Sequence, residues 1–216
     1  MISSIIFDFD GVILESVPVK TEAFRQIFAF SPDHIDEIVR FHQENGGMSR
    51  FDKFRHIYQN ILHEPLSNAQ FKLLSDRFSL LVENGVIDAP FVDGAAELLQ
   101  TISNKYSLYI VSATPQDELI RIAQTRKISE FFRGIFGSPL KKRDHILRII
   151  QENRFDPNKV LFIGDAVNDW EAALSCGAKF IARVMPGDTD RFINLPGVDQ
   201  RIVTMHDLKK ILEGDK

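Results

Sequence analysis

The stretch that decides the fold is Ser4-Ile5-Ile6-Phe7-Asp8-Phe9-Asp10-Gly11-Val12-Ile13, close to the first residue of the chain. Its apolar run predicts a buried strand over residues 4–9. Because side chains alternate along a strand, Asp8 and Asp10 point to the same side, and Gly11 lets the chain turn sharply away. Two carboxylates at this spacing repel each other unless a cation or a shared proton lies between them. The stretch therefore predicts a functional site at the end of the first strand.

The rest of the chain divides into two kinds of pattern. From about residue 17 to residue 85 the apolar spacing is helical and no strand is indicated. We expect helices here over residues 19–30, 33–45, 49–61 and 67–85, the last two capped by Ser49 and by a Ser67–Gln70 capping box. After residue 89, strands alternate with helices. We expect strands over residues 106–111, 134–136, 160–164 and 178–184, and helices over residues 93–103, from 114–115 onward, 141–152, 168–175 and 206–212.

Strands that alternate with helices predict an α/β fold with a doubly wound parallel sheet, a Rossmann-like core. We expect this core to comprise residues 1–14 and 89–216, and the all-helical segment 15–88 to be an inserted cap domain. Sheets of this kind bind ligands beyond the carboxyl ends of their strands.

Composition narrows the class of partner. The chain has 216 residues, 44% of them hydrophobic, which is enough for a packed core. A net charge of -4 without basic blocks gives no reason to expect nucleic acid or a membrane surface as partner. No apolar stretch is long enough for a membrane span, and the single cysteine, Cys176, excludes an intrachain disulfide. These features predict a cytoplasmic protein.

Polar side chains follow four of the predicted strands. They are Asp8 and Asp10 after the first strand, Ser112 and Thr114 after the second, Lys141 and Lys142 after the third, and Asp165 and Asp169 after the fourth. In a parallel sheet these positions converge on one edge. Several carboxylates, a hydroxyl and a lysine suit a phosphate group together with Mg²⁺, which binds through few carboxylates and keeps water and phosphate oxygens as its other ligands.

The same residues carry a family resemblance. The chain resembles the haloacid dehalogenase superfamily, in its phosphatase branch with a helical cap after the first strand, like phosphoglycolate phosphatases and beta-phosphoglucomutases. The family pattern is D-x-D-G-[TV], a Ser or Thr at a strand end, a Lys, and G-D-x-x-x-D. The matching residues, in this order, are Asp8-Phe9-Asp10-Gly11-Val12, Ser112, Lys141 or Lys142, and Gly164-Asp165-Ala166-Val167-Asn168-Asp169. The resemblance covers essentially the whole chain.

The resemblance implies roles for the acidic residues. Asp8 would be the nucleophile that forms an aspartyl phosphate. Asp10 would protonate the leaving oxygen and then deprotonate the water that hydrolyses the intermediate. Asp8, the backbone carbonyl of Asp10 and Asp165 would hold Mg²⁺, with Asp169 supporting the same ligand sphere.

The resemblance also implies a phosphoryl-binding set. Ser112 and nearby backbone amides, including that of Ala113, would bind the phosphoryl oxygens, and a helix starting at Pro115 would add its positive dipole end. The lysine would neutralise the charge shared by Asp8 and phosphate. The order Gly137-Ser138-Pro139-Leu140-Lys141-Lys142 resembles a family variant that selects Lys142, with Lys141 as the alternative.

Two features of the inserted segment differ from or add to the family pattern. Glu15 stands where relatives often carry aspartate, at the hinge to the cap. Gly46-Gly47 forms a turn ahead of two cations, Arg50 and Lys53. This loop either closes over the site, so that Arg50 or Lys53 meets a second anionic group of the substrate, or is an interhelical loop with solvated charges.

The function predicted from these residues is that of a magnesium-dependent phosphatase acting on a small phosphorylated metabolite. The alternative within the family is a sugar phosphomutase, which shares the cap type and the core residues. A catalytically silent binding protein is a third reading, which the loss of a core carboxylate would favour, and none is missing here. The sequence alone leaves the identity of the metabolite open.

Overall fold

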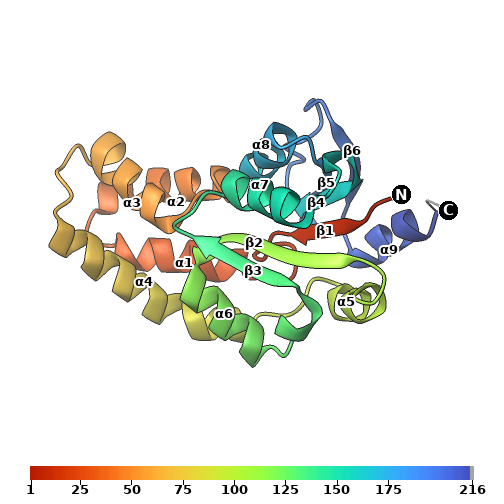
Figure 1. Ribbon diagram of the computed structural model, residues 1–216. Coiled ribbons are helices and arrows are strands. Elements are labelled where there is room, and N and C mark those ends of the chain that lie inside the picture. Colours follow the sequence, from red (N-terminus) through yellow and green to blue (C-terminus); the bar gives the residue numbers. More distant parts are fainter. Residues whose placement is uncertain (215–216) are drawn as a thin grey trace.

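The computed structural model describes residues 1–214 and contains a six-stranded sheet in the order β3-β2-β1-β4-β5-β6 (Figure 1). The strands are β1 (Ser4–Phe7), β2 (Ser107–Pro115), β3 (Gly134–Ser138), β4 (Val160–Gly164), β5 (Lys179–Arg183) and β6 (Val198–Ile202). Every neighbouring pair is parallel. The predicted doubly wound α/β core is therefore confirmed, with β1 in the middle, between β2 and β4.

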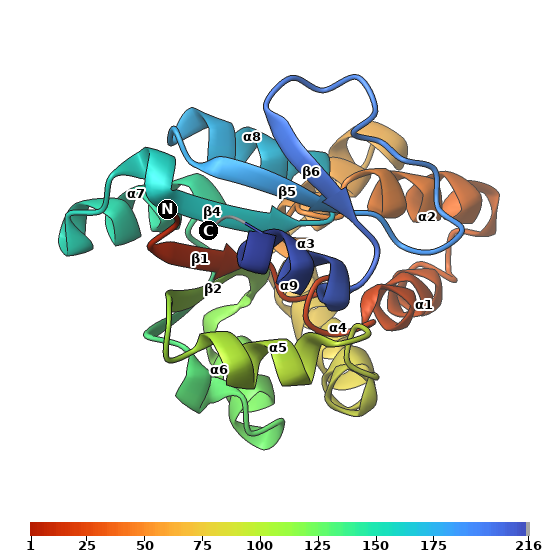
Figure 2. The same ribbon diagram turned by 90° about the vertical axis from the view of Figure 1, so that its right-hand side faces the viewer.

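Helices cover both faces of the sheet (Figure 2). They are α5 (Ala95–Ile102), α6 (Gln116–Thr125), α7 (Lys142–Asn153), α8 (Val167–Ser175) and α9 (Met205–Gly214). Alternation along β1 sends Ile6 to the face covered by α7 and α8, and Ile5 and Phe7 to the face covered by α5, α6 and α9. Both faces are therefore apolar, which explains the nearly continuous hydrophobic runs of the inner strands.

The regular elements between β1 and α5 are helices and helical turns. They comprise α1 (Val17–Ile27), α2 (Ile35–Glu44), α3 (Arg50–His56) and α4 (Asn68–Asp88), with a 3₁₀ turn at Pro32–His34 and a π-helical turn at Ile57–Ile61 that continues α3. We call residues 15–88 the helical insertion. The predicted caps are present, because Ser49 accepts a hydrogen bond from the Asp52 amide and Ser67 forms a capping box with Gln70.

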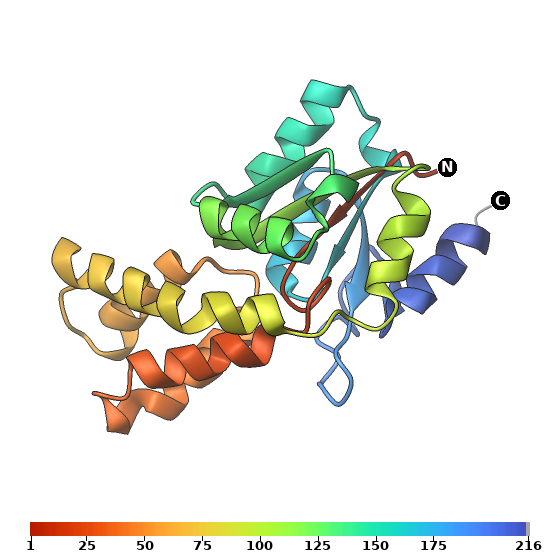
Figure 3. The ribbon, with the colours of Figure 1, turned by 90° about the horizontal axis from the view of Figure 1, so that it is seen from below.

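Phenylalanines hold the helical insertion together. The Phe24 ring centroid lies 5.0 Å from that of Phe78 and 5.7 Å from that of Phe54. The same hydrophobic cluster continues into the sheet face that contains Ile5. Figure 3 shows the insertion beyond the carboxyl ends of the strands, where the sequence placed the ligand site.

Three details add to or correct the sequence analysis. β6 was not predicted; it is an edge strand whose central residues Asp199, Gln200 and Arg201 are exposed, so it lacks an apolar run. β2 continues through Thr114 to Pro115, and α6 begins one residue later, because the missing proline amide is tolerated at a strand end.

Within residues 1–214, no helix combines the length and apolar character that a membrane crossing requires.

Candidate active site

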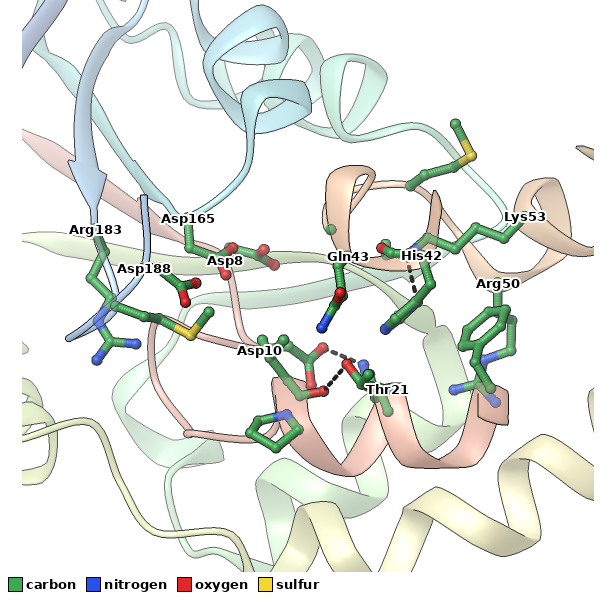
Figure 4. Close-up of a pocket in the computed structure, with 18 of the residues that line it drawn as sticks. Asp8, Asp10, Thr21, His42, Gln43, Arg50, Lys53, Asp165, Arg183 and Asp188 are labelled. Carbon is green, nitrogen blue, oxygen red and sulfur yellow. Dashed lines mark hydrogen bonds and ion pairs between the residues drawn. The ribbon is translucent and has the colours of Figure 1, made fainter. Parts of the chain in front are cut away.

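A pocket of about 590 Å³ lies between the carboxyl edge of the sheet and the helical insertion (Figure 4). From the core it is lined by Asp8, Asp10, Ser112, Ala113, Thr114 and Asp165, and from the insertion by Lys20, Thr21, His42, Arg50 and Lys53. Five of the residues that the sequence placed after strands, Asp8, Asp10, Ser112, Thr114 and Asp165, therefore meet in one cavity. Lys142 and Asp169 do not line it, but Lys142 contacts Asp8 and Asp169. The glycine turn of the insertion also reaches this edge, because a Cβ on Gly47 would lie 3.0 Å from the Asn168 Cβ.

Asp8 lies at one end of a buried chain of ion pairs, with Lys142 in the middle and Asp169 at the other end. The Lys142 ammonium is 2.7 Å from Asp8 Oδ2 and 2.6 Å from Asp169 Oδ1. Burial raises the pKa of Asp8 well above its ordinary value, although the Lys142 ammonium favours the charged form. Burial disfavours the Lys142 ammonium too, but the carboxylates of Asp169 and Asp8 outweigh burial and raise the Lys142 pKa. Asp8 Oδ1 accepts a hydrogen bond from the Phe9 amide at 2.7 Å, so both oxygens are held in place at the wall of the pocket. A carboxylate positioned in this way is a suitable nucleophile.

The structure distinguishes between the two lysines that the sequence left open. Lys142 is buried at the start of α7 and touches Asp8, whereas Lys141 is the exposed residue that precedes the helix. Of the two lysines, Lys142 is therefore the one that contacts the carboxylates of the site.

Asp165 completes a cluster that suits a divalent cation. Asp8, Asp165 and Asp169 each bring a carboxylate oxygen within 4.8 Å of the others. Asp169 is already engaged, by Lys142 at one oxygen and by the Ala166 amide at the other, 3.2 Å away. Asp165 has no ion pair within residues 1–214, and burial together with Asp169 raises its pKa to about 7. The donors are hard oxygens, so Asp8 and Asp165 fit a Mg²⁺ ion that Asp169 supports.

The backbone at Gly11 lies very close to the Asp165 carboxylate. Gly11 has a φ of +74°, which favours glycine, and a Cβ at this position would lie 2.2 Å from Asp165 Oδ2. Any side chain here would clash with the Asp165 carboxylate. The glycine of the N-terminal motif is therefore required by the carboxylate that follows β4.

We expect Asp165→Asn to raise the melting temperature of the metal-free protein at pH 8. The amide removes a carboxylate whose charged form is disfavoured, a gain of about 1 kcal/mol or more, or roughly 2–4 °C for a chain of this size. Differential scanning calorimetry in EDTA measures the gain. Added Mg²⁺ should then stabilise the parent more than the variant.

The control for this experiment is Asp188→Asn, which removes an exposed carboxylate at the same pocket. It should change the melting temperature little in either condition. A lower melting temperature for Asp165→Asn in EDTA would mean that Asp165 is a structural acceptor and not a cation ligand.

Asp10 is held by three donors. Ser16 Oγ donates to Asp10 Oδ1 at 2.6 Å, Thr114 Oγ1 donates to Oδ2 at 2.9 Å, and the Lys20 ammonium forms an ion pair with Oδ2. Burial disfavours the carboxylate, but Lys20 and these hydrogen bonds outweigh burial and lower the pKa of Asp10. Asp10 is therefore ionised in this conformation and able to accept a proton.

Lys20 was missed by the sequence analysis. It lies in the first turns of α1 and also donates to Thr114 Oγ1 at 2.8 Å, so it ties the insertion to β2 as well as to Asp10. No local pattern marks a single lysine on a helix. Only the placement of α1 over the sheet edge brings it into the site.

Ser112 and Ala113 lie where a phosphoryl group would meet the end of β2. Both line the pocket, and Ser112 is buried with its Oγ accepting a hydrogen bond from the Thr114 amide at 3.1 Å. The hydroxyl proton of Ser112 is then free to point to a ligand oxygen. α6 begins at Gln116, so its N-terminal amides follow directly.

The two cations of the insertion are buried, with exposed fractions of 6% for Arg50 and 2% for Lys53, so the solvated-charge alternative is wrong. Arg50 Nη2 pairs with Glu118 of α6 at 2.6 Å, and Ser79 bridges the two side chains. Lys53 instead donates to His42, at 2.9 Å to Nδ1 and 3.0 Å to the carbonyl oxygen. Arg50 therefore links the insertion to the core, while Lys53 has no carboxylate partner within residues 1–214.

Glu15 also forms an ion pair that the sequence analysis did not foresee. Arg183, at the end of β5, is buried and donates from Nη1 to Glu15 Oε2 at 2.9 Å and to the Gly11 carbonyl at 2.9 Å. The longer glutamate side chain thus bridges the start of the insertion to the core. This pair fixes the hinge next to the metal-ligand candidates.

Proteins similar to this chain include hydrolases and phosphatases. A sequence profile described as haloacid dehalogenase-like hydrolase matches residues 5–183. Phosphoglycolate phosphatase from Synechococcus elongatus is 28% identical over 192 residues, which are 87% of this chain and 86% of that protein. Phosphoglycolate phosphatase 1 from Pseudomonas aeruginosa is 23% identical over 184 residues, 82% of this chain and 68% of that protein.

Among solved structures, a hydrolase from Pseudomonas syringae superposes with a TM-score of 0.81. Its sequence is 20% identical, and the match covers 98% of both chains. This likeness shows that the fold, including the helical insertion, recurs as a whole.

Proposed function

Because the chain belongs to the haloacid dehalogenase-like hydrolase family, we propose that it is a magnesium-dependent phosphatase that hydrolyses a small phosphorylated metabolite through a phosphorylated Asp8. The observation that carries the proposal is the placement of Asp8. It is buried beside Lys142 at 2.7 Å, it faces the pocket, and Asp10 and Asp165 line the same pocket. This arrangement offers a nucleophile, a proton carrier and a cation site to one phosphate group.

In the first half-reaction, an Asp8 oxygen attacks phosphorus and the bond from phosphorus to the ester oxygen breaks. Asp10 gives a proton to the leaving oxygen. Lys142 neutralises charge shared by Asp8 and the phosphoryl group, and Ser112 with the Ala113 amide binds phosphoryl oxygens. The products are an alcohol and the acyl phosphate of Asp8.

In the second half-reaction, water attacks the phosphorus atom and Asp10 takes its proton, which restores Asp8 and releases phosphate. The contacts to Lys20, Ser16 and Thr114, which lower the Asp10 pKa, support this step because they keep the base ionised. Asp10 has to be protonated for the first half-reaction and ionised for the second. The substrate must therefore change the surroundings of Asp10 when it binds.

Asp8, the Asp10 carbonyl and Asp165 would hold Mg²⁺, with Asp169 in support. When bound, the ion shields the phosphate charge from Asp8 and orients one phosphoryl oxygen. The Asp8–Lys142–Asp169 chain would hold the nucleophile in place beside the phosphoryl group.

We further propose the predicted division of the chain, with residues 1–14 and 89–216 as the catalytic core and 15–88 as a cap domain. The ion pair from Arg50 to Glu118 and the bidentate pair from Arg121 to Glu83 join the two parts in the described conformation. The cap would then exclude water from the site and bear on the non-reacting end of the substrate.

Hydrolysis is favoured over phosphoryl transfer between sugar positions. The curated relatives described above are both named phosphatases, and Asp8, Asp10 and Asp165 line one cavity. A mutase would convert one sugar monophosphate into its isomer through a bisphosphate intermediate, without net phosphate release. A phosphatase releases one phosphate per turnover.

The test is phosphate release from an aryl phosphate, such as 4-nitrophenyl phosphate, with and without Mg²⁺, followed by a screen of metabolite phosphates. We expect release that depends on Mg²⁺ and stops in EDTA. Equal release in EDTA would exclude the magnesium-dependent mechanism. No release from any ester, combined with isomerisation of a sugar phosphate, would favour the mutase.

A further inference from the structure

Among residues 1–214, the charge balance around the pocket leaves one buried cation without a carboxylate partner. The buried or nearly buried cations pair with carboxylates as follows: Lys20 with Asp10, Arg50 with Glu118, Lys142 with Asp8 and Asp169, and Arg183 with Glu15. Lys53 is the exception among residues 1–214. A buried ammonium without a counter-ion is costly, and burial together with the Lys20 charge lowers the Lys53 pKa to about 7. An anionic group that enters the pocket would remove this cost.

His42 lies between Lys53 and the centre of the pocket. Its Nδ1 accepts a hydrogen bond from the Lys53 ammonium at 2.9 Å, and burial followed by the Lys53 charge lowers the His42 pKa to about 2. The ring is therefore neutral, and the hydrogen bond assigns its proton to Nε2. The ring stacks on Phe24 with centroids 4.2 Å apart and points into the pocket between Thr21 and Gln43 (Figure 4).

The donors of this pair match a carboxylate. Lys53 has three N–H donors, and the Nδ1 and carbonyl oxygen of His42 use two of them. One donor is left on Lys53, and the His42 Nε2–H makes no hydrogen bond within residues 1–214. Two donors and one positive charge fit two oxygens that share one negative charge. A neutral hydroxyl would leave the ammonium uncompensated.

We propose that Lys53 and His42 form the subsite for the non-reacting end of the substrate, and that this end carries a carboxylate. The inference rests on the proposed phosphatase function and narrows its substrate class to phosphomonoesters of hydroxy acids. Lys53 supplies the charge and, through its hydrogen bond, fixes the tautomer in which His42 donates. Arg50 is not the charged group of this subsite, because Glu118 already compensates it.

The test compares matched esters that differ only in the carboxylate. The pairs are 2-phosphoglycolate with 2-hydroxyethyl phosphate, and 3-phosphoglycerate with glycerol 3-phosphate. We expect the parent to favour the carboxylate member by about 10- to 100-fold in kcat/KM, the effect of one charge-assisted hydrogen bond. In Lys53→Met this ratio should fall towards one. Lys72→Met, at an exposed position of α4, is the control and should leave the ratio unchanged.

The outcomes separate this inference from the proposed function. An equal rate for both members in the parent, or an unchanged ratio in Lys53→Met, overturns the inference. If no ester is hydrolysed, the phosphatase function fails, and equilibrium binding of the same esters to Asp8→Asn decides on the subsite. Weaker binding of 2-phosphoglycolate after Lys53→Met is added would support the subsite. Equal or unmeasurable binding would overturn it.

The pH dependence gives a second readout. Lys53 is charged below about pH 7, and an anion stabilises that form, so the preference for the carboxylate member should decline above this pH. The charged groups that act on Lys53 are Lys20 from α1, and Asp10, Lys142 and Asp165 from the core, while His42 from α2 stays neutral. These groups act on both esters of a pair, so the ratio isolates the subsite. A ratio that does not change between pH 6 and pH 8.5 would contradict the assignment.

Discussion

Asp8→Asn should reduce kcat for every phosphomonoester that the protein hydrolyses by at least about 10⁴-fold. The amide has nearly the shape of the carboxylate but no lone pair that attacks phosphorus readily. It also removes the group that Lys142 contacts at 2.7 Å. Steady-state phosphate release with 2-phosphoglycolate and with 4-nitrophenyl phosphate measures the loss.

The fold should survive this substitution. Burial raises the Asp8 pKa, so a neutral side chain at this position relieves a cost, and Lys142 keeps its 2.6 Å contact with Asp169. We therefore expect the melting temperature of Asp8→Asn to equal or exceed that of the parent. Asp188→Asn serves as the matched control, since it removes a carboxylate of the same pocket without touching the cluster. Activity of more than a few per cent in Asp8→Asn would show that water attacks the ester directly.

The sequence predicted the part of the site that lies directly after strands. Asp8, Ser112 and Asp165 each follow an apolar run, and a parallel sheet brings the carboxyl ends of its strands to one edge. For these residues, the local sequence pattern that marks the end of a strand also determines where the residue lies in the folded protein. The N-terminal capping signals of α3 and α4 were readable for the same reason, since each involves residues only three apart.

Contacts between distant segments could not be predicted in this way. Glu118 is 68 residues from Arg50, and the two meet only because the insertion packs on α6. Lys53 and His42 lie on different helices, so their hydrogen bond depends on the angle between α2 and α3. The strand β6 was missed for a local reason. Its central residues are exposed to solvent, so it lacks the apolar residues by which strands are recognised in a sequence.

Asp10→Asn should separate the two half-reactions. With an alkyl phosphate such as glycerol 3-phosphate, kcat should fall by about 10²- to 10⁴-fold, because the leaving alkoxide then lacks a proton donor. With 4-nitrophenyl phosphate the leaving group needs no proton, so phosphorylation of Asp8 should continue. The second half-reaction still lacks its base. Phosphorylated Asp8 should therefore accumulate.

A burst of nitrophenolate equal to the enzyme concentration, followed by a slow steady state, is the expected signature in stopped-flow measurements. Intact-mass spectrometry of the quenched enzyme should show one added phosphoryl group, which would be absent in the Asp8→Asn/Asp10→Asn double variant. The proposed role of Asp10 as the base rests on its contacts with Ser16, Lys20 and Thr114, which all stabilise its charged form. If the loss were the same for both esters and no burst appeared, Asp10 would act before the chemical steps, by positioning Lys20 and the cap through its ion pair. The size of the burst thus decides whether Asp10 moves protons or only holds the insertion against the sheet edge.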